Sequence, residues 1–121
     1  MSIKRGEIHL AALDQTIGRE IAKTRPVVIV SNDVNNQFSG TVSVLPIASK
    51  NLQKIYPFEV MLPKGAGNLP KNSKVKADQI RTLDKRRLIK RIGRLGDEDM
   101  IAVDTALKIH LGIESELNVE R

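Results

Sequence analysis

Strand patterns dominate the first 83 residues, and in Gly6–Leu13 and Lys74–Leu83 alternate residues fall on opposite faces with a period of two, as is typical of β-strands. The run Val27–Val30 is wholly aliphatic, which favours a buried strand. Polar or glycine-rich connections are expected at Asp14–Thr24, Asn32–Gly40 and Pro63–Asn72. The strands predicted between them and after them cover Gly6–Leu13, Arg25–Ser31, Thr41–Ile47, Pro57–Leu62, Lys74–Leu83 and Ile89–Leu95.

The period changes near the C-terminus, where one helix is expected. Asp97 is the predicted N-cap, acidic residues follow it in the first turn, and Gly112 ends the helix. A shorter helical turn is expected from Asp84 to Leu88. One apolar stripe follows from the spacing of Met100, Val103, Leu107 and Leu111. The pattern as a whole predicts a single domain over residues 1–121, mainly antiparallel β with a C-terminal α-helix.

Composition and charge narrow the classes of function. The 121 residues include no cysteine, which excludes disulfide scaffolds, cysteine-ligated metals and thiol nucleophiles. Of the 20 Lys and Arg residues, ten lie in residues 71–94 beside only two acids, and the formal net charge is +6. Such a segment predicts a polyanionic partner, either nucleic acid or an acidic protein segment, although a solvated face explains it equally well. No apolar run approaches the length of a membrane span or a signal peptide, so we expect a cytoplasmic protein.

Five ordered blocks then resemble the MazF/PemK (Kid) family of toxin endoribonucleases. They are KRGEI at residues 4–8, GRE followed by RPVVIV within 18–30, ND and FSGTV within 32–42, PIAS and YPFEV within 46–60, and ADQIRTLDK leading to RL within 77–88. The resemblance covers residues 4 to about 112, nearly the whole chain.

The resemblance implies a small SH3-like antiparallel β-barrel with a C-terminal helix, as in MazF, Kid and CcdB. It also implies an endoribonuclease that needs no metal or other cofactor and cleaves single-stranded RNA, including mRNA, by attack of the ribose 2′-OH on the adjacent phosphorus. The expected partners are a second copy of the chain, in a homodimer, and a cognate antitoxin whose acidic, flexible C-terminal segment neutralises the toxin. No membrane partner is expected.

Arg25 is the first catalytic candidate, because it opens a strand after a polar loop and matches the essential arginine of the family's Arg-Pro pair. The alternative is a surface arginine that pairs with Glu20 or Asp78. The family's catalytic threonine falls on Ala48, which has no hydroxyl. Ser49 is the neighbouring catalytic candidate. Either its hydroxyl suffices, or Ala48 marks an inactivated chain.

Lys76 and Asp78 are expected to share one face of a strand, as residues i and i+2 do. In Kid-like relatives a basic residue and an acid at these positions flank the scissile phosphate. The resemblance therefore gives Lys76 a role in RNA binding and Asp78 a catalytic role as proton acceptor, or a role in reading a base. The alternative is an exposed ion pair worth under about 1 kcal/mol. Arg19, Glu20 and Gln79 are expected to contact RNA, with loop solubility as the alternative.

The two histidines, His9 and His110, could in principle act as a general acid–base pair in RNA cleavage. We instead expect His9 to pack in a strand and His110 to sit near the end of the helix. Glu7 is expected to hold a structural hydrogen bond near Lys4 and Arg5. Two distant histidines are no metal-ligand set. With only three aromatic residues, RNA affinity should come mainly from Lys and Arg.

Two other classes remain open on the same fold. A CcdB-like toxin binds DNA gyrase and ends in a Trp-Gly-Ile type tail, whereas this chain ends at Leu117–Arg121 without one. An inactive relative that only binds RNA or antitoxin is kept open by Ala48. Arg25 and the Asp78-Gln79 pair favour the nuclease.

Overall fold

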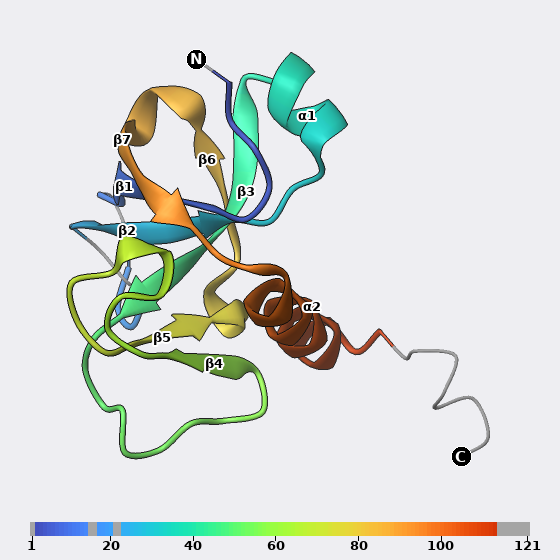
Figure 1. Cartoon of the computed structure of the whole chain (residues 1–121). Coiled ribbons are helices and arrows are strands. Elements are labelled where there is room, and N and C mark those ends of the chain that lie inside the picture. The colour runs from blue at the N-terminus through green and yellow to red at the C-terminus, as the bar shows by residue number, and fades with distance from the viewer. Residues whose placement is uncertain (1, 15–16, 21–22, 114–121) are drawn as a thin grey trace.

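The computed structural model describes residues 2–14, 17–20 and 23–113 (Figure 1). The helices are α1 (Asp33–Phe38) and α2 (Asp97–Leu111), and the 3₁₀ turns are η1 (Ala66–Asn68), η2 (Ala77–Gln79) and η3 (Lys85–Arg87). The strands are β1 (Glu7–Ala12), β2 (Thr24–Ile29), β3 (Thr41–Ala48), β4 (Glu59–Leu62), β5 (Ser73–Lys76), β6 (Arg81–Asp84) and β7 (Leu88–Arg94).

The strands form one antiparallel sheet in the order β4-β5-β3-β2-β1-β7, with β6 also paired to β3. The predicted class, mainly β with a C-terminal helix, is confirmed. The sheet is not closed, since β4 and β7 stand at the two ends of this order. The turn η1 lies against β7, where Asn68 donates to the Ile92 carbonyl at 3.2 Å. The backbone of Gly67 lies so close to Gly93 that a Cβ atom added to Gly93 would be 2.3 Å from the Gly67 carbonyl oxygen.

The predicted strand Lys74–Leu83 is wrong in one important respect, because it is two strands. Both β5 and β6 pair with the same edge of β3, β5 near its end and β6 near its start. The pairing register shifts by three residues between them, and the three residues of η2 take up the shift. Pro46 lies in β3 beside this break and has no amide hydrogen to donate to a neighbouring strand.

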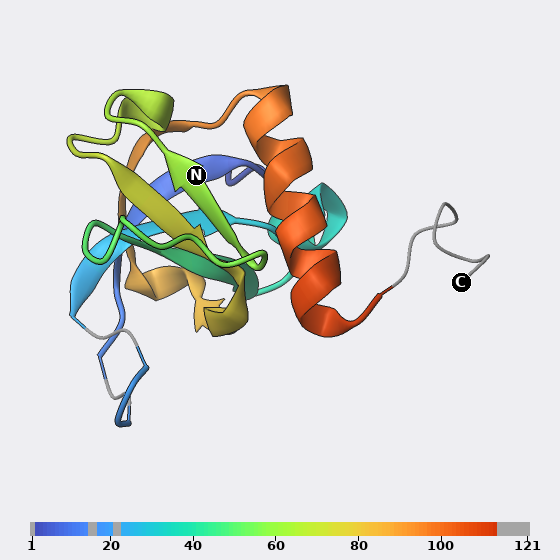
Figure 2. The same cartoon turned by 90° about the horizontal axis from the view of Figure 1, so that it is seen from below.

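The core is divided between two clusters of buried side chains. Alternate residues of the strands supply opposite faces, so Val28 and Leu45 belong to one cluster and Val27 and Val44 to the other. Helix α2 covers the first cluster through Met100, Val103 and Ala106 (Figure 2).

The C-terminal helix matches its prediction, with two differences at its ends. Its N-cap is Gly96 rather than Asp97, and the expected acids occupy the first turn. Gly112 ends the helix at φ +71°, as predicted. Leu111 was expected in the apolar stripe but is exposed, because the stripe turns away from the sheet in the last turn.

The segment Asn32–Gly40, expected to be only a connection, contains the short helix α1. Its polar residues form a cap: the Asn32 side chain accepts from the Asn35 amide at 2.8 Å. Asp33 accepts from the Arg5 amide at 2.7 Å and from Asn36, and these bonds lower the pKa of Asp33. The expected helical turn after Asp84 is confirmed as η3, capped by that side chain.

Candidate functional site

The ends of β2, β3, β4 and β5 bring polar side chains to one face of the sheet. Opposed residues of an antiparallel pair present their side chains on the same face. Ala48 is opposite Lys74, and Glu59 is opposite Lys76. The pairing of β2 with β3 ends at Val27 opposite Pro46, so Arg25 and Ala48 each lie two residues beyond the last paired residues. Residues far apart in the sequence therefore meet around the position of the family's threonine.

Glu59 is the centre of this face. Its Oε2 accepts from Lys76 Nζ at 2.6 Å, and its Oε1 accepts from Lys74 Nζ at 3.1 Å and from the Tyr56 amide at 3.0 Å. The Glu59 side chain is only 1% exposed and that of Lys74 only 6%. Burial by itself would raise the pKa of Glu59, but the hydrogen bonds from Lys76, Tyr56 and Lys74 outweigh it, and the pKa is lowered.

Asp78 reaches the same face from η2, not from a strand, which corrects the expected i, i+2 arrangement with Lys76. The two remain neighbours: Lys76 Nζ lies 3.9 Å from Asp78 Oδ1. This distance exceeds a hydrogen bond. Among the described residues, Oδ1 of Asp78 is buried and has no hydrogen-bond partner. The Asp78 side chain as a whole is 30% exposed and lines the pocket described next, so a ligand there can reach its carboxylate.

These side chains line an open pocket of about 470 Å³. Its lining carries four cationic residues and one acid: Arg19, Lys50, Lys74, Lys76 and Asp78, with Ala48, Asn51 and Gln79. Gln79 donates from Nε2 to the Arg19 carbonyl at 3.3 Å, so the described part of the first loop is tied to η2. Glu20 lines an adjoining hollow of about 230 Å³ together with Asp78 and Gln79. The residues expected to contact RNA thus lie together.

Ser49 lies just beyond β3 and lines a different, smaller pocket of about 160 Å³. Arg25 also lines this second pocket, with Pro70 and Lys71 among the other residues. The structure therefore groups Ala48 with Lys76 and Asp78, and groups Ser49 with Arg25. Ile47 and Ser49 line one pocket and Ala48 lines the other, because successive side chains of an extended segment point to opposite faces.

Sequence reasoning missed Glu59 and Lys74. One signal was present: Glu59 is the only acid between Asp33 and Asp78, and it lies in the otherwise apolar segment Pro57–Leu62. A lone acid in such a segment needs a buried cationic partner. Which cation meets it depends on the register of β4 and β5, which the sequence does not specify.

The histidines lie outside this cluster. His9 is buried in β1, with Nε2 at 2.9 Å from Glu7 Oε1. Glu7 also accepts from the Lys4 amide at 3.1 Å, the structural bond expected for it. His110 is exposed on α2, with its ring centroid 6.4 Å from that of Phe58.

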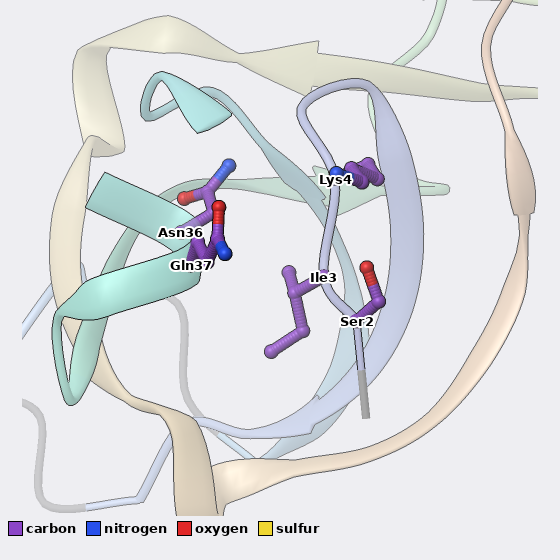
Figure 3. A pocket seen from close by; sticks show the side chains of 5 residues that line it. All are labelled: Ser2, Ile3, Lys4, Asn36 and Gln37. Carbon is purple, nitrogen blue, oxygen red and sulfur yellow. The ribbon is translucent and has the colours of Figure 1, made fainter. Parts of the chain in front are cut away.

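Within the ranges that the structure describes, no three His, Asp or Glu side chains are placed to hold a metal ion. None of the helices there has the length and apolar character needed to cross a bilayer. A further pocket, of about 330 Å³, lies between the N-terminal segment and α1 and is lined by Ser2, Ile3, Lys4, Asn36 and Gln37 (Figure 3). It contains none of the expected site residues.

The fold and the pocket define a small antiparallel β-protein with a cationic hollow at the ends of its central strands, suited by charge to an anionic ligand. A family model for the PemK-like, MazF-like toxin of type II toxin–antitoxin systems matches residues 4–111. The chain belongs to this family. The resemblance found in the sequence is thereby confirmed.

Solved structures support the same assignment. MazF from Deinococcus radiodurans is 27% identical, covers 93% of this chain and 98% of its own, and superposes with a TM-score of 0.80. An endoribonuclease in complex with its cognate antitoxin, from a Mycobacterial species, is 25% identical, with coverage of 93% and 98% and a TM-score of 0.77. A MazE–MazF structure from Deinococcus radiodurans contains a chain 31% identical, with the same coverage and a TM-score of 0.68.

Proposed function

We propose that this protein is an endoribonuclease whose active face comprises Arg25, position 48, Lys76 and Asp78. Its substrate is single-stranded RNA, including mRNA. The observation that carries the proposal is the Asp78 carboxylate, whose side chain is 30% exposed in the pocket lining and lies 3.9 Å from the Lys76 ammonium. An acceptor beside a cation is what the 2′-OH and its adjacent phosphate require.

The reaction is an internal transfer of the phosphoryl group. Asp78 takes the proton of the ribose 2′-OH while O2′ bonds to phosphorus and the P–O5′ bond breaks. Lys76 and Arg25 stabilise the negative charge that develops on the phosphoryl oxygens. O5′ takes up a proton from solvent and leaves as an alcohol, so the products carry a 2′,3′-cyclic phosphate and a free 5′-OH. None of these steps needs a metal ion or other cofactor.

Other parts of the face are assigned to substrate and partner binding. Arg19, Glu20 and Gln79 contact RNA beside the cleaved bond, because they line the same pocket and the hollow next to it. The toxin acts in the cytoplasm as one domain over residues 1–121. The antitoxin's acidic C-terminal segment occupies the cationic pocket, and an acidic peptide of that kind should displace RNA in a competition assay.

A homodimer is part of the proposal. Helix α2 carries three large apolar side chains that are each at least half exposed: Ile101, Ile109 and Leu111. The adjoining Ile113 is exposed as well. A monomer of this size has little reason to leave such side chains in water. Sedimentation showing only a monomer at micromolar concentration would count against the dimer.

The alternative function is a relative that binds RNA or antitoxin without cleaving, and Ala48 is the observation that favours it. A CcdB-like gyrase-binding toxin is the other alternative on this fold. Residues 117–121, which distinguish a CcdB-like tail, lie outside the described residues.

Single-turnover cleavage of a long unstructured RNA in the presence of a chelator tests the proposal. Asp78→Asn should slow cleavage about 10²–10⁴-fold, the usual contribution of a positioned general base. Lys90→Met is the matched control, since Lys90 lies on β7 away from the pocket, and it should cleave normally. If both the unmodified chain and Ala48→Thr are folded and bind RNA but leave it intact, the binding-only alternative replaces the nuclease.

A further inference from the structure

Glu59 holds three donors from three parts of the chain. Lys76 and the largely buried Lys74 both belong to the pocket lining, and the Tyr56 amide lies in the connection before β4. All three meet on one carboxylate that is 1% exposed. A carboxylate this deeply buried has little direct access to a substrate, so any effect on the reaction must pass through its partners.

Lys74 extends this network into the connection between β3 and β4. Its Nζ donates to the Asn51 carbonyl at 3.0 Å and to the Lys54 carbonyl at 3.2 Å, in addition to Glu59. The ammonium therefore has a partner for each of its three hydrogens. Asn51 lines the pocket, so one buried ion pair connects the pocket rim to the carboxylate.

We propose that Glu59 is a positioning residue, which holds the Lys76 ammonium at the phosphate side of the pocket and, through Lys74, holds the rim at Asn51. The proposal rests on the function proposed for Lys76. It assigns no chemistry to Glu59 itself, because the carboxylate reaches the reacting atoms only through these partners.

The physical reason lies in the lysine side chain. A lysine carries a compact charge on a flexible four-carbon stem, and without a partner its ammonium samples many positions. Oε2 of Glu59 at 2.6 Å uses one of the three Lys76 hydrogens. Asp78, the other acid near this ammonium in the described ranges, is beyond hydrogen-bond distance at 3.9 Å. Two hydrogens are thus directed by Glu59 and remain available for phosphate oxygens.

Positioning predicts an unusual combination of effects. Glu59→Gln removes a negative charge near the RNA, so electrostatics alone makes RNA binding equal or tighter. A released Lys76 should nevertheless slow cleavage, by about 10- to 100-fold if its ammonium moves by the order of 1 Å. A purely structural role would weaken binding and cleavage together.

The first experiment needs no cleavage activity. The folded protein is treated with a limiting amount of an amine-acylating ester, and modification of each lysine is followed by peptide mass spectrometry. Lys76 should be labelled about tenfold faster in Glu59→Gln than in the unmodified chain, the factor expected for one lost charge-assisted hydrogen bond. Lys74→Met leaves the Glu59–Lys76 bond in place and should leave labelling of Lys76 unchanged. Equal labelling of Lys76 in all three proteins would overturn the proposal.

The second experiment is a double-mutant cycle on cleavage. Single-turnover rates are compared for the unmodified chain, Glu59→Gln, Lys76→Met and the double variant, and affinity is measured with uniformly 2′-O-methylated single-stranded RNA, which cannot react. Glu59→Gln should slow cleavage without weakening affinity, and its further effect should be much smaller once Lys76 is absent, limited to the rim that Lys74 holds at Asn51. An equal loss in both backgrounds would overturn the positioning role.

Two further variants distinguish a failure of the positioning role from misfolding and from a failure of the role proposed for Lys76. Glu59→Gln leaves the buried Lys74 ammonium without its carboxylate, so Glu59→Gln/Lys74→Met, which removes both buried charges, replaces it if the single variant does not fold. Failure of the proposed function appears elsewhere: a Lys76→Met variant that cleaves at the normal rate refutes the role of Lys76 in the reaction, whatever the labelling shows.

Discussion

Restoring a hydroxyl at position 48 is the sharpest test of the site. Ala48 is the last residue of β3, lies opposite Lys74 and lines the pocket that contains Lys76 and Asp78. It is partly exposed, so a larger side chain has room, and threonine is well suited to a strand. Ala48→Thr therefore adds one hydroxyl to the charged face with little expected change in stability.

The size of the effect follows from the donor that is missing. One positioned hydrogen-bond donor in a transition state contributes about 10²–10³ in rate. We expect Ala48→Thr to accelerate single-turnover RNA cleavage by that factor. Ser49→Ala should change the rate much less, because the family's catalytic threonine falls on position 48 and not on position 49.

The assay follows cleavage of a long unstructured RNA in chelator, with each variant first shown to be folded by thermal unfolding. Ala48→Val is the matched control, since valine has the shape of threonine without its hydroxyl. Only the threonine variant should gain activity.

Two results would refute this reasoning. If Ala48→Thr cleaves no faster than Ala48→Val, while folded and able to bind RNA, a hydroxyl at position 48 is not what the chain lacks. If Ser49→Ala abolishes cleavage by the otherwise unmodified chain, the Ser49 hydroxyl supplies the donor, and a hydroxyl at position 48 is not required.

Three further predictions concern charge. Arg25→Ala should slow cleavage about 10³–10⁵-fold, as the loss of a phosphate-clamping arginine does, and a single-turnover rate within tenfold of the unmodified chain would contradict that role. Raising salt from about 50 to 200 mM should weaken RNA binding roughly 50-fold if four phosphates are neutralised, measured by fluorescence anisotropy; a salt-independent Kd would place the basic segment elsewhere. Glu59→Gln should lower the free energy of unfolding by about 3–5 kcal/mol at pH 7, because Lys74 keeps an unpaired buried charge. The pKa of Glu59 is lowered from its ordinary value of 4.5, so its stabilisation is present above that value and lost as the pH falls through the lowered pKa. Urea titrations should therefore show the two proteins converging at low pH, and a constant difference would exclude the carboxylate as the cause.

Local pattern determined much of the fold. The alternation in β1, β2 and β3 and the helical spacing from Met100 to Leu107 predicted these elements, because each segment must turn one apolar face to the core. The sequence pattern gave the wrong element where polar residues can either form a connection or cap a helix. The polar residues beginning at Asn32 indicated a connection, yet that asparagine caps helix α1.

The blocks along the sequence also determined the family and most of the residues of the candidate site. Arg19, Glu20, Lys76, Asp78 and Gln79 were all named from those blocks, and the structure places them around one pocket and the hollow beside it. Their separate roles remain predictions, since the contacts describe where they lie and not what each one does.

Only the tertiary structure decided how the site is assembled. The three-residue shift between β5 and β6 carries Asp78 out of the strand and leaves its Oδ1 without a donor in the described ranges. The register of β4 against β5 sets Glu59 opposite Lys76. Register depends on which strands meet, and a slip of one residue turns every side chain to the other face. The charged residues of this site can be identified in the sequence, but the pairing of distant strands determines which of them face one another.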